Sequence, residues 1–284
     1  MINVNKFRST KEILNIFNRF GKKYKYIVYT AVYGELDELQ DPKLNVSEDI
    51  LFVCFTNRKD IFSKVWNIIY QDCDLDKRMS AKYWKFFGYR YFQKKSKYII
   101  WVDASLKIIN SFLPLLNEIE QNDFKSSIFT FNHPNRNCVY SEFFWLFITG
   151  KENILNLIKT WFFLKKKRYL CGNGLIAGGF IIRKVENYKN IILDSLMKEW
   201  WLCVQKYSSR DQLTFNYLID KKQYRRLHAY IKIEGDIFNC RYLSQVRSIK
   251  FHTKIDPKSK TNFIFKIYYL LYLLKSFIKK NNDN

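Results

Sequence analysis

The chain has 284 residues, of which 48% are hydrophobic and 18% aromatic, and this excludes a largely disordered protein. Lys and Arg number 49 against 26 Asp and Glu, giving a formal net charge of +23, which favours an anionic partner: nucleic acid, an acidic membrane or a phosphorylated substrate. The N-terminus lacks a signal-peptide core and the six cysteines form no CxxC pair, so we expect reduced thiols in the cytoplasm.

The first predicted element is an N-terminal helix within residues 1–23. Ser9 and Glu12 have the spacing of a capping box, and Gly21 follows the last apolar residue of the pattern. We expect one domain over residues 24–260.

Two predicted strands open that domain, at 26–33 and 49–55. Both are almost continuously apolar, as in strands buried on both faces. Gly34 ends the first, and Thr56 and Asn57 follow the second. That polar pair either hydrogen-bonds a base or ribose or forms an ordinary turn.

A helix is predicted over residues 76–93. Arg78 and Lys82 are four residues apart and share a face. That face either holds a diphosphate or is solvated surface.

The central predicted strand, 98–102, runs directly into Asp103. Ligands of open α/β sheets bind at the carboxyl ends of the strands, and an unpaired carboxylate is costly to desolvate. Asp103 is therefore either a site residue with a partner or a helix cap.

A further strand, 127–131, precedes His133, Arg136 and Glu142. An aromatic helical stretch then covers roughly 141–168. It closes on a basic run, which is typical of a solvated helix end.

Glycines and a charged triplet mark the later part of the domain. Gly178 and Gly179 open a strand and allow backbone to approach a ligand closely, although neither a Rossmann fingerprint nor a P-loop is present. A helix is predicted over 186–206, and the Arg210, Asp211, Gln212 triplet opens the next one.

Residues 261–284 are predicted to be a basic amphipathic C-terminal helix and tail. The uninterrupted apolar run, 267–274, is far shorter than the roughly 20 residues that span a bilayer. The tail either lies in an anionic membrane interface or docks on the domain.

Strands and helices alternate over residues 26–183, which predicts an α/β fold with a mainly parallel central sheet flanked by helices. With its ordered polar sites, the chain resembles GT-A-type nucleotide-sugar glycosyltransferases, and more closely the glycosyltransferase-like family first catalogued as domain of unknown function 616. The segments that carry this resemblance cover most of residues 26–220: 29–34, 55–57, Arg78 with Lys82, 98–103, 133–136 with Glu142, 174–179 and 210–212.

The chain is also similar, more weakly, to the glycogenin and galactosyltransferase superfamily. Asp103 matches the first acid of a DxD motif, but Ser105 replaces the second. His252 matches a late metal-binding histidine. This likeness implies a Mn²⁺ or Mg²⁺ site at Asp103, Ser105 and His252, weakened by the lost carboxylate.

The resemblance implies transfer of a hexose-type sugar from a nucleotide sugar, with UDP expected, to a glycan or lipid-linked acceptor in surface polysaccharide synthesis. It implies an enzyme peripheral to the inner membrane face. Asp103, Asp211 and Glu142 are the expected catalytic acids. The expected donor-binding residues are Thr30, Tyr33, Thr56, Asn57, Arg78, Lys82, Gly178, Gly179, Arg210, Gln212 and Lys258.

Two other function classes remain open. The charge and aromatic content suit a nucleic-acid-binding protein, but the aromatic residues lie in apolar segments rather than on an exposed stacking platform, so nucleic acid is not the expected partner. The missing second acid leaves room for a non-catalytic or hydrolytic relative on the same fold.

Overall fold

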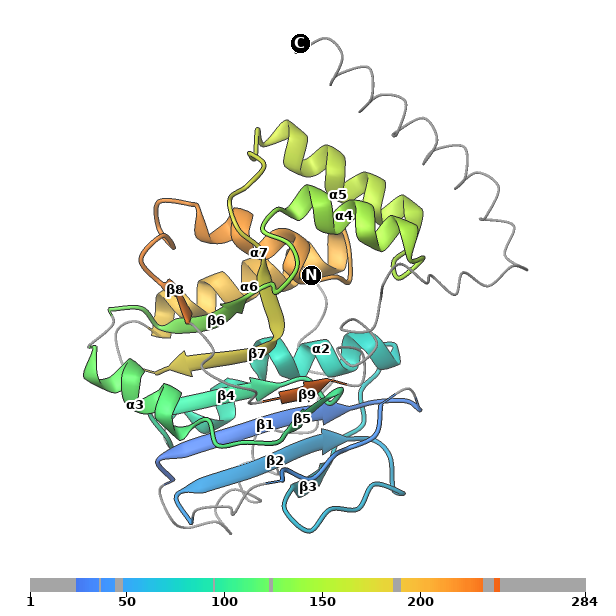
Figure 1. The fold of residues 1–284 in the computed structure, drawn as a ribbon. Coiled ribbons are helices and arrows are strands. Elements are labelled where there is room, and N and C mark those ends of the chain that lie inside the picture. Colours follow the sequence, from blue (N-terminus) through green and yellow to red (C-terminus); the bar gives the residue numbers. More distant parts are fainter. Residues whose placement is uncertain are drawn as a thin grey trace.

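The computed structural model describes residues 24–35, 37–43, 48–93, 95–122, 125–185, 190–231 and 238–240. Its main feature is a seven-stranded sheet with the order β3-β2-β1-β4-β7-β6-β8 (Figure 1). The strands are β1 (Tyr26–Val32), β2 (Ile50–Thr56), β3 (Asn67–Tyr70), β4 (Tyr98–Val102), β6 (Ile128–Asn132), β7 (Ile176–Lys184) and β8 (His228–Ile231). A second, two-stranded sheet pairs β5 (Leu106–Ile108) with β9 (Phe238–Cys240).

The large sheet is mixed but mainly parallel. β3, β2, β1 and β4 pair in parallel, as do β6 and β8, whereas β7 pairs antiparallel with both β4 and β6. The expected α/β class with a mainly parallel sheet is confirmed.

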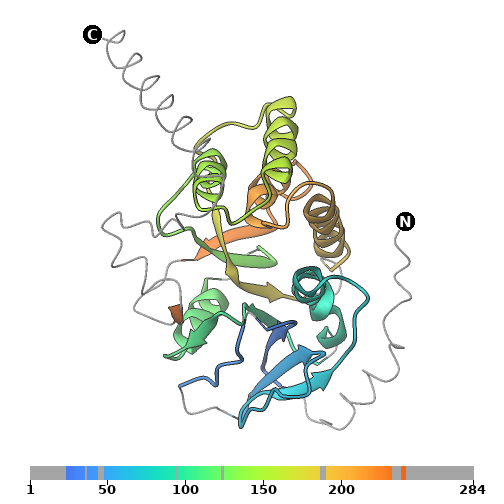
Figure 2. The same ribbon diagram turned by 90° about the vertical axis from the view of Figure 1, so that its right-hand side faces the viewer.

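Helices cover both faces of this sheet (Figures 1 and 2). α2 (Lys77–Phe87), the 3₁₀ helix η2 (Gly88–Phe92), α6 (Asn190–Lys206) and α7 (Gln212–Ile219) pack on one face, and α3 (Leu113–Gln121) packs on the other. α4 (Val139–Ile148) and α5 (Ile154–Lys166) share a separate small core with α7. They lie at the end of the molecule farthest from β2 and β3.

The apolar strands form because both of their faces are buried. Along β1, Ile27 and Tyr29 belong to the core on the α2 side, and Tyr26 and Val28 to the core on the α3 side. Alternation of side chains in a strand therefore sends every residue into a hydrophobic layer.

Aromatic contacts fix α2 against the sheet. The ring of Trp84 stacks on Phe55 with centroids 3.7 Å apart, and its Nε1 donates to the Tyr33 hydroxyl at 2.8 Å. At the start of the helix, the Asp76 side chain accepts from the backbone N–H groups of Arg78 and Met79, as an N-cap does. This packing places α2 beside the carboxyl ends of the central strands.

The helical stretch expected over 141–168 is two helices. α4 ends before Gly150, whose φ of 59° is in the left-handed region, and Asn153 caps the start of α5 by accepting from Leu155 N. This turn reverses the chain, so that the apolar faces of α4 and α5 pack against each other.

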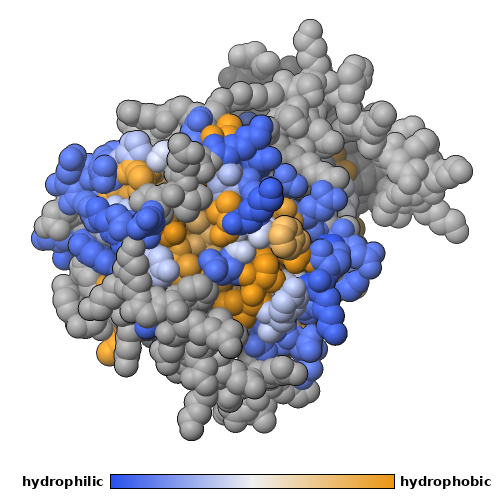
Figure 3. Space-filling model, turned by 90° about the horizontal axis from the view of Figure 1, so that it is seen from below, coloured by the Kyte–Doolittle hydropathy of each residue, from blue (hydrophilic) through white to orange (hydrophobic). Residues whose placement is uncertain are grey.

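The predicted terminal segments, 1–23 and 261–284, lie outside the described residues. Within the described part of the chain, none of the helices is both long and apolar enough to cross a bilayer. Viewed from below, the molecule has hydrophobic surface near the centre of the described area, bordered by hydrophilic residues (Figure 3).

Candidate functional site

Asp103 leaves the central strand at its carboxyl end, as expected from the sequence. Its backbone N–H donates to the Gly179 carbonyl at 2.8 Å, which ties it to β7. Its Oδ1 accepts from Trp101 Nε1 at 2.5 Å and lies 3.4 Å from Lys85 Nζ. The side chain is 38% exposed, so Asp103 is paired and still accessible to a ligand.

Asp211 is the second acid of this site and is buried. It caps α7 by accepting from the Gln212 backbone N–H, and its carbonyl accepts from Trp200 Nε1 at 2.8 Å. Its carboxylate lies 2.5 Å from Lys85 Nζ and 3.3 Å from Lys82 Nζ. Burial acts to raise the pKa of Asp211, but the two ammonium groups hold that pKa well below its ordinary value.

Lys85 joins the two acids, although it is absent from the residues expected at the site. Burial acts to lower the pKa of Lys85, but Asp103 and Asp211 raise it above its ordinary value, so the ammonium stays charged. The available signal in the sequence was its position three residues after Lys82, on the same helix face.

The two glycines of β7 form one wall of this site. A Cβ on Gly178 would lie 3.3 Å from Lys85 Nζ and 3.5 Å from Asp211 Oδ2. A Cβ on Gly179 would lie 3.5 Å from Asp103 Oδ2 and 2.9 Å from a Leu106 methyl carbon. The glycines let both acids and Lys85 approach the strand backbone.

Glu142 belongs to an adjoining cluster on α4. Its Oε1 accepts from Gln212 Nε2 at 2.7 Å, and its Oε2 pairs with Arg136. His133 lies beside this pair, and burial together with Arg136 lowers its pKa to about 4. Because Gln212 follows Asp211, the two clusters meet at the start of α7.

The two expected arginines face the loop before α7. Arg78 Nη1 donates to the Ser209 hydroxyl at 3.0 Å, and Arg210 Nη2 donates to the Lys151 carbonyl at 2.6 Å. Arg210 directly precedes Asp211 in the sequence, but these hydrogen bonds of the two arginines go to the loops around Ser209 and Lys151 rather than to the acids.

Three of the expected donor-binding side chains are part of the core. Thr30, Tyr33 and Thr56 are all buried. The Tyr33 hydroxyl donates to the Gln71 carbonyl at 2.7 Å, and the Thr56 hydroxyl donates to the Val32 carbonyl at 2.7 Å. These two bonds tie together the ends of β1, β2 and β3. The three side chains do not line an open surface, which differs from the expectation.

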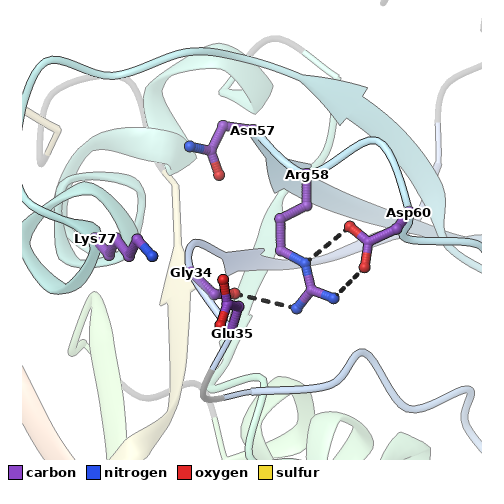
Figure 4. A pocket seen from close by; sticks show the side chains of 6 residues that line it. All are labelled: Gly34, Glu35, Asn57, Arg58, Asp60 and Lys77. Atoms are coloured by element: carbon purple, nitrogen blue, oxygen red, sulfur yellow. Dashed lines mark hydrogen bonds and ion pairs between the residues drawn. The ribbon is translucent and has the colours of Figure 1, made fainter.

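Asn57, by contrast, is exposed and lines a pocket beyond the ends of β1 and β2 (Figure 4). The pocket has a volume of about 420 Å³. Arg58 Nη1 donates to the Gly34 carbonyl at 3.1 Å, and its Nε donates to Asp60. Lys77, from the first turn of α2, faces them from the opposite side. The full lining is Gly34, Glu35, Asn57, Arg58, Asp60 and Lys77.

The expected metal site lies only partly within the described residues. They contain no group of three His, Cys, Asp or Glu side chains that could hold a metal ion, and the carboxylate of Asp103 already pairs with Lys85. Ser105, two residues further on, offers only a hydroxyl. His252, like the donor-binding candidate Lys258, lies outside the described residues, so the Mn²⁺ or Mg²⁺ site stays a prediction.

The arrangement brings two carboxylates and two ammonium groups together at the carboxyl end of β4, beside the glycine backbone of β7 and on the helix whose Lys77 lines the polar pocket. Such a site can hold a polyanion and stabilise negative charge that develops on it.

Comparison with models of protein families identifies the family of this chain. A comparison with solved structures finds apo mouse xyloside xylosyltransferase 1, with 13% sequence identity over 74% of this chain and 85% of that chain and a TM-score of 0.40, a similarity from which we draw no conclusion. No curated protein matches the sequence. The model of the family described as "TOD1/MUCI70, glycosyltransferase-like domain" matches residues 12–246. Because that match spans most of the chain, the protein belongs to the TOD1/MUCI70 glycosyltransferase-like family, and the glycosyltransferase class expected from the sequence is confirmed.

Proposed function

We propose that the enzyme transfers a hexose-type sugar from a nucleotide sugar, with UDP as the first candidate nucleotide, to a glycan or lipid-linked acceptor in surface polysaccharide synthesis. The observation that carries the proposal is the convergence of Lys82 and Lys85 on Asp103 and Asp211. A departing nucleoside diphosphate needs positive charge of this kind beside it.

In the proposed reaction, the acceptor oxygen forms a bond to C1 of the sugar as the bond between C1 and the donor's phosphate oxygen breaks. The electron pair of that bond stays on the diphosphate, where Lys82 and Lys85 stabilise it. The acceptor proton passes to the diphosphate or to a carboxylate. Asp103 is the more accessible acid, since its side chain is 38% exposed and that of Asp211 is 7% exposed.

The nucleoside of the donor suits the pocket beyond β1 and β2 (Figure 4). α2 links the two places, because Lys77 lines the pocket and Lys82 and Lys85 follow on the same helix. Asn57 offers an amide for hydrogen bonds to a base or ribose.

The test is a screen of nucleotide sugars for hydrolysis or transfer by the full chain, with an Asp103→Asn variant as the control. Turnover of one donor that is lost in the variant supports the proposal. A chain that turns over none of them, and that is stabilised thermally by single-stranded oligonucleotide instead, would support the nucleic-acid alternative.

A membrane-bound acceptor is supported by the outer face of α5. Five apolar residues recur there at helical spacing and are all exposed: Ile154 at 47%, Leu155 at 61%, Ile158 at 43%, Trp161 at 36% and Phe162 at 62%. The opposite face of α5, with Leu157 and Leu164, is buried.

Cations surround this apolar stripe. Lys159, Lys166, Lys167 and Arg168 are exposed, and Lys165 Nζ lies 4.5 Å from the ring centre of Tyr140. Apolar side chains with a basic border fit a membrane interface rich in anionic lipid. We therefore infer that α5 rests on the inner membrane face, near a lipid-linked acceptor.

A further inference from the structure

The place between Asp103 and Asp211 is taken by one ammonium group. Lys85 Nζ lies 3.4 Å from Asp103 Oδ1 and 2.5 Å from Asp211 Oδ2, and its side chain is 3% exposed. The two acids come from different parts of the fold, the end of β4 and the start of α7. Lys85 therefore bridges them as a bound cation would.

The backbone of Lys85 is held from behind by two buried side chains. Its carbonyl, in the last turn of α2, accepts from Arg183 Nη2 at 2.7 Å and from the Tyr29 hydroxyl at 3.2 Å. Carbonyls in the last turn of a helix lack partners within the helix, so these bonds fix the turn that carries Lys85. Arg183 is 0% exposed.

Charge balance argues against adding a divalent cation at the same place. Lys82, Lys85, Asp103 and Asp211 carry two positive and two negative charges. A divalent ion between the acids would have to displace the Lys85 ammonium, and like charges repel strongly at a buried site. Room for that displacement is small on one side, because even a Cβ on Gly178 would lie only 3.3 Å from Nζ.

We propose that Lys85 takes the place of a divalent metal ion, and that Lys85 and Lys82 bind the diphosphate of a nucleoside diphosphate without one. The identity of the ligand rests on the proposed function, whereas the placement of the cation rests on the contacts above. In this proposal, the Lys85 ammonium takes the place of the Mn²⁺ or Mg²⁺ ion that the sequence led us to expect.

The first experiment measures nucleotide binding by the full chain. UDP, GDP and ADP are titrated calorimetrically, once with EDTA and once with Mn²⁺. We expect the diphosphate that binds to do so with dissociation constants within about twofold of each other in the two buffers. A loss of more than about tenfold in EDTA would overturn the proposal.

The second experiment uses variants in the buffer with EDTA. Lys85→Met keeps the length of the side chain and removes its charge, and should weaken diphosphate binding about tenfold or more. Lys222→Met, at an exposed lysine after α7, is the control and should bind as the wild type does. Unchanged binding by a folded Lys85→Met variant would contradict the proposal, and if that variant does not fold, the EDTA comparison on the wild type decides.

A third measurement separates this proposal from the proposed function. The electron paramagnetic resonance signal of free Mn²⁺ is recorded with the wild type and with Asp103→Asn. An unchanged signal with the wild type supports the bridging role of Lys85. Mn²⁺ binding that Asp103→Asn removes overturns it. If no nucleoside diphosphate binds in either buffer, the proposed function fails and the Mn²⁺ measurement still decides the role of Lys85.

Discussion

At the scale of single residues, the two acids of the site differ in their surroundings. Asp211 is buried, forms ion pairs with Lys82 and Lys85, and caps α7. Asp103 is more exposed, and among the lysines that the structure describes it pairs with Lys85. We therefore expect the buried acid to contribute more to stability and the accessible acid to contribute more to ligand binding.

Asp211→Asn should destabilise the fold more than Asp103→Asn does. Removing one partner of a buried pair leaves uncompensated charge and costs about 3 kcal/mol in the free energy of unfolding. The corresponding loss at the half-exposed Asp103 should be about 1 kcal/mol or less, while its glycosyl transfer should be abolished. Urea unfolding of the two variants, with turnover measured alongside, checks this, and the opposite order of stability would contradict it.

Asp211 should also make stability depend on acid pH. Since its pKa is lowered in the folded state, the unfolded chain binds a proton at higher pH than the folded chain. The stability it contributes is fully present above the unfolded value of about 3.9 and is lost as pH falls through the folded pKa. Denaturant melts below pH 4 should therefore be less pH-dependent in Asp211→Asn.

The two acids were predicted from the sequence, whereas Lys85 was missed because its signal was weak. Asp103 and Asp211 stand where a buried strand ends and where a helix begins, which are positions that local patterns reveal. Lys85 is one cation among several on a helix, and only the packing of α2 against β7 shows that it is buried. Thr56, whose polar side chain suggested a ligand contact, is buried and does not line an open surface.

At the scale of elements, β8 carries a half-buried titratable group at its first residue. His228 Nε2 lies 2.7 Å from the Thr130 hydroxyl oxygen, and its ring packs edge-on against Phe215 and Tyr230. Burial lowers the pKa of His228 to about 3. The imidazole is therefore neutral in the folded protein at any pH near neutrality.

Lowering the pH should weaken the attachment of β8. Between about pH 6.5, where the unfolded His228 titrates, and about pH 3, the unfolded chain binds the extra proton, so stability falls by about 1.4 kcal/mol per pH unit from this residue. His228→Gln keeps a hydrogen-bonding group and removes the titration. Unfolding free energies measured from pH 7 to pH 5 should show a shallower slope in this variant, with the contribution of His133 remaining in both proteins.

The turn between α4 and α5 shows what local signals could have added. Gly150 and the capping residue Asn153 lie between two aromatic runs. Glycine is typical of the end of a helix and asparagine of the start of one. The continuous apolar character of the region hid them. The exposed stripe of α5 could not be predicted, because its sequence is apolar on two faces and only the packing shows which face is covered.

At the scale of the whole molecule, the net charge of +23 and the α5 stripe lead to one prediction. The full chain should float with vesicles that contain anionic lipid and not with neutral vesicles. Leu155→Glu combined with Phe162→Glu should abolish flotation, because two charges would enter the apolar interface.

The matched control for that experiment lies on α6. Leu202 is 61% exposed, as Leu155 is, and Leu202→Glu should leave flotation unchanged. Truncation after Thr261 measures the contribution of the tail separately. Flotation of the double variant at the wild-type level would show that α5 does not contact the membrane.

The fold class followed from the sequence, but the strand order and the direction of β7 did not. Buried strands are recognisable by their continuous apolar runs. The partner and direction of a strand depend on contacts between distant segments, such as Ile100 with Ile182 across β4 and β7. The family resemblance rested on polar residues at the ends of these strands. It could therefore be recognised without knowing the strand order or the direction of β7.

The insertion of β7 between β4 and β6 also bears on how the protein is made. The strands β3, β2, β1 and β4 are complete once residue 102 has been synthesised, but β7 ends only at Lys184. A ribosome needs about 4 to 16 s for the roughly 80 residues between them. During that time the edge of β4, the strand that ends at Asp103, has no neighbour and is open to pairing with another nascent chain. We expect the yield of native protein to depend on translation speed and chaperone access over this interval.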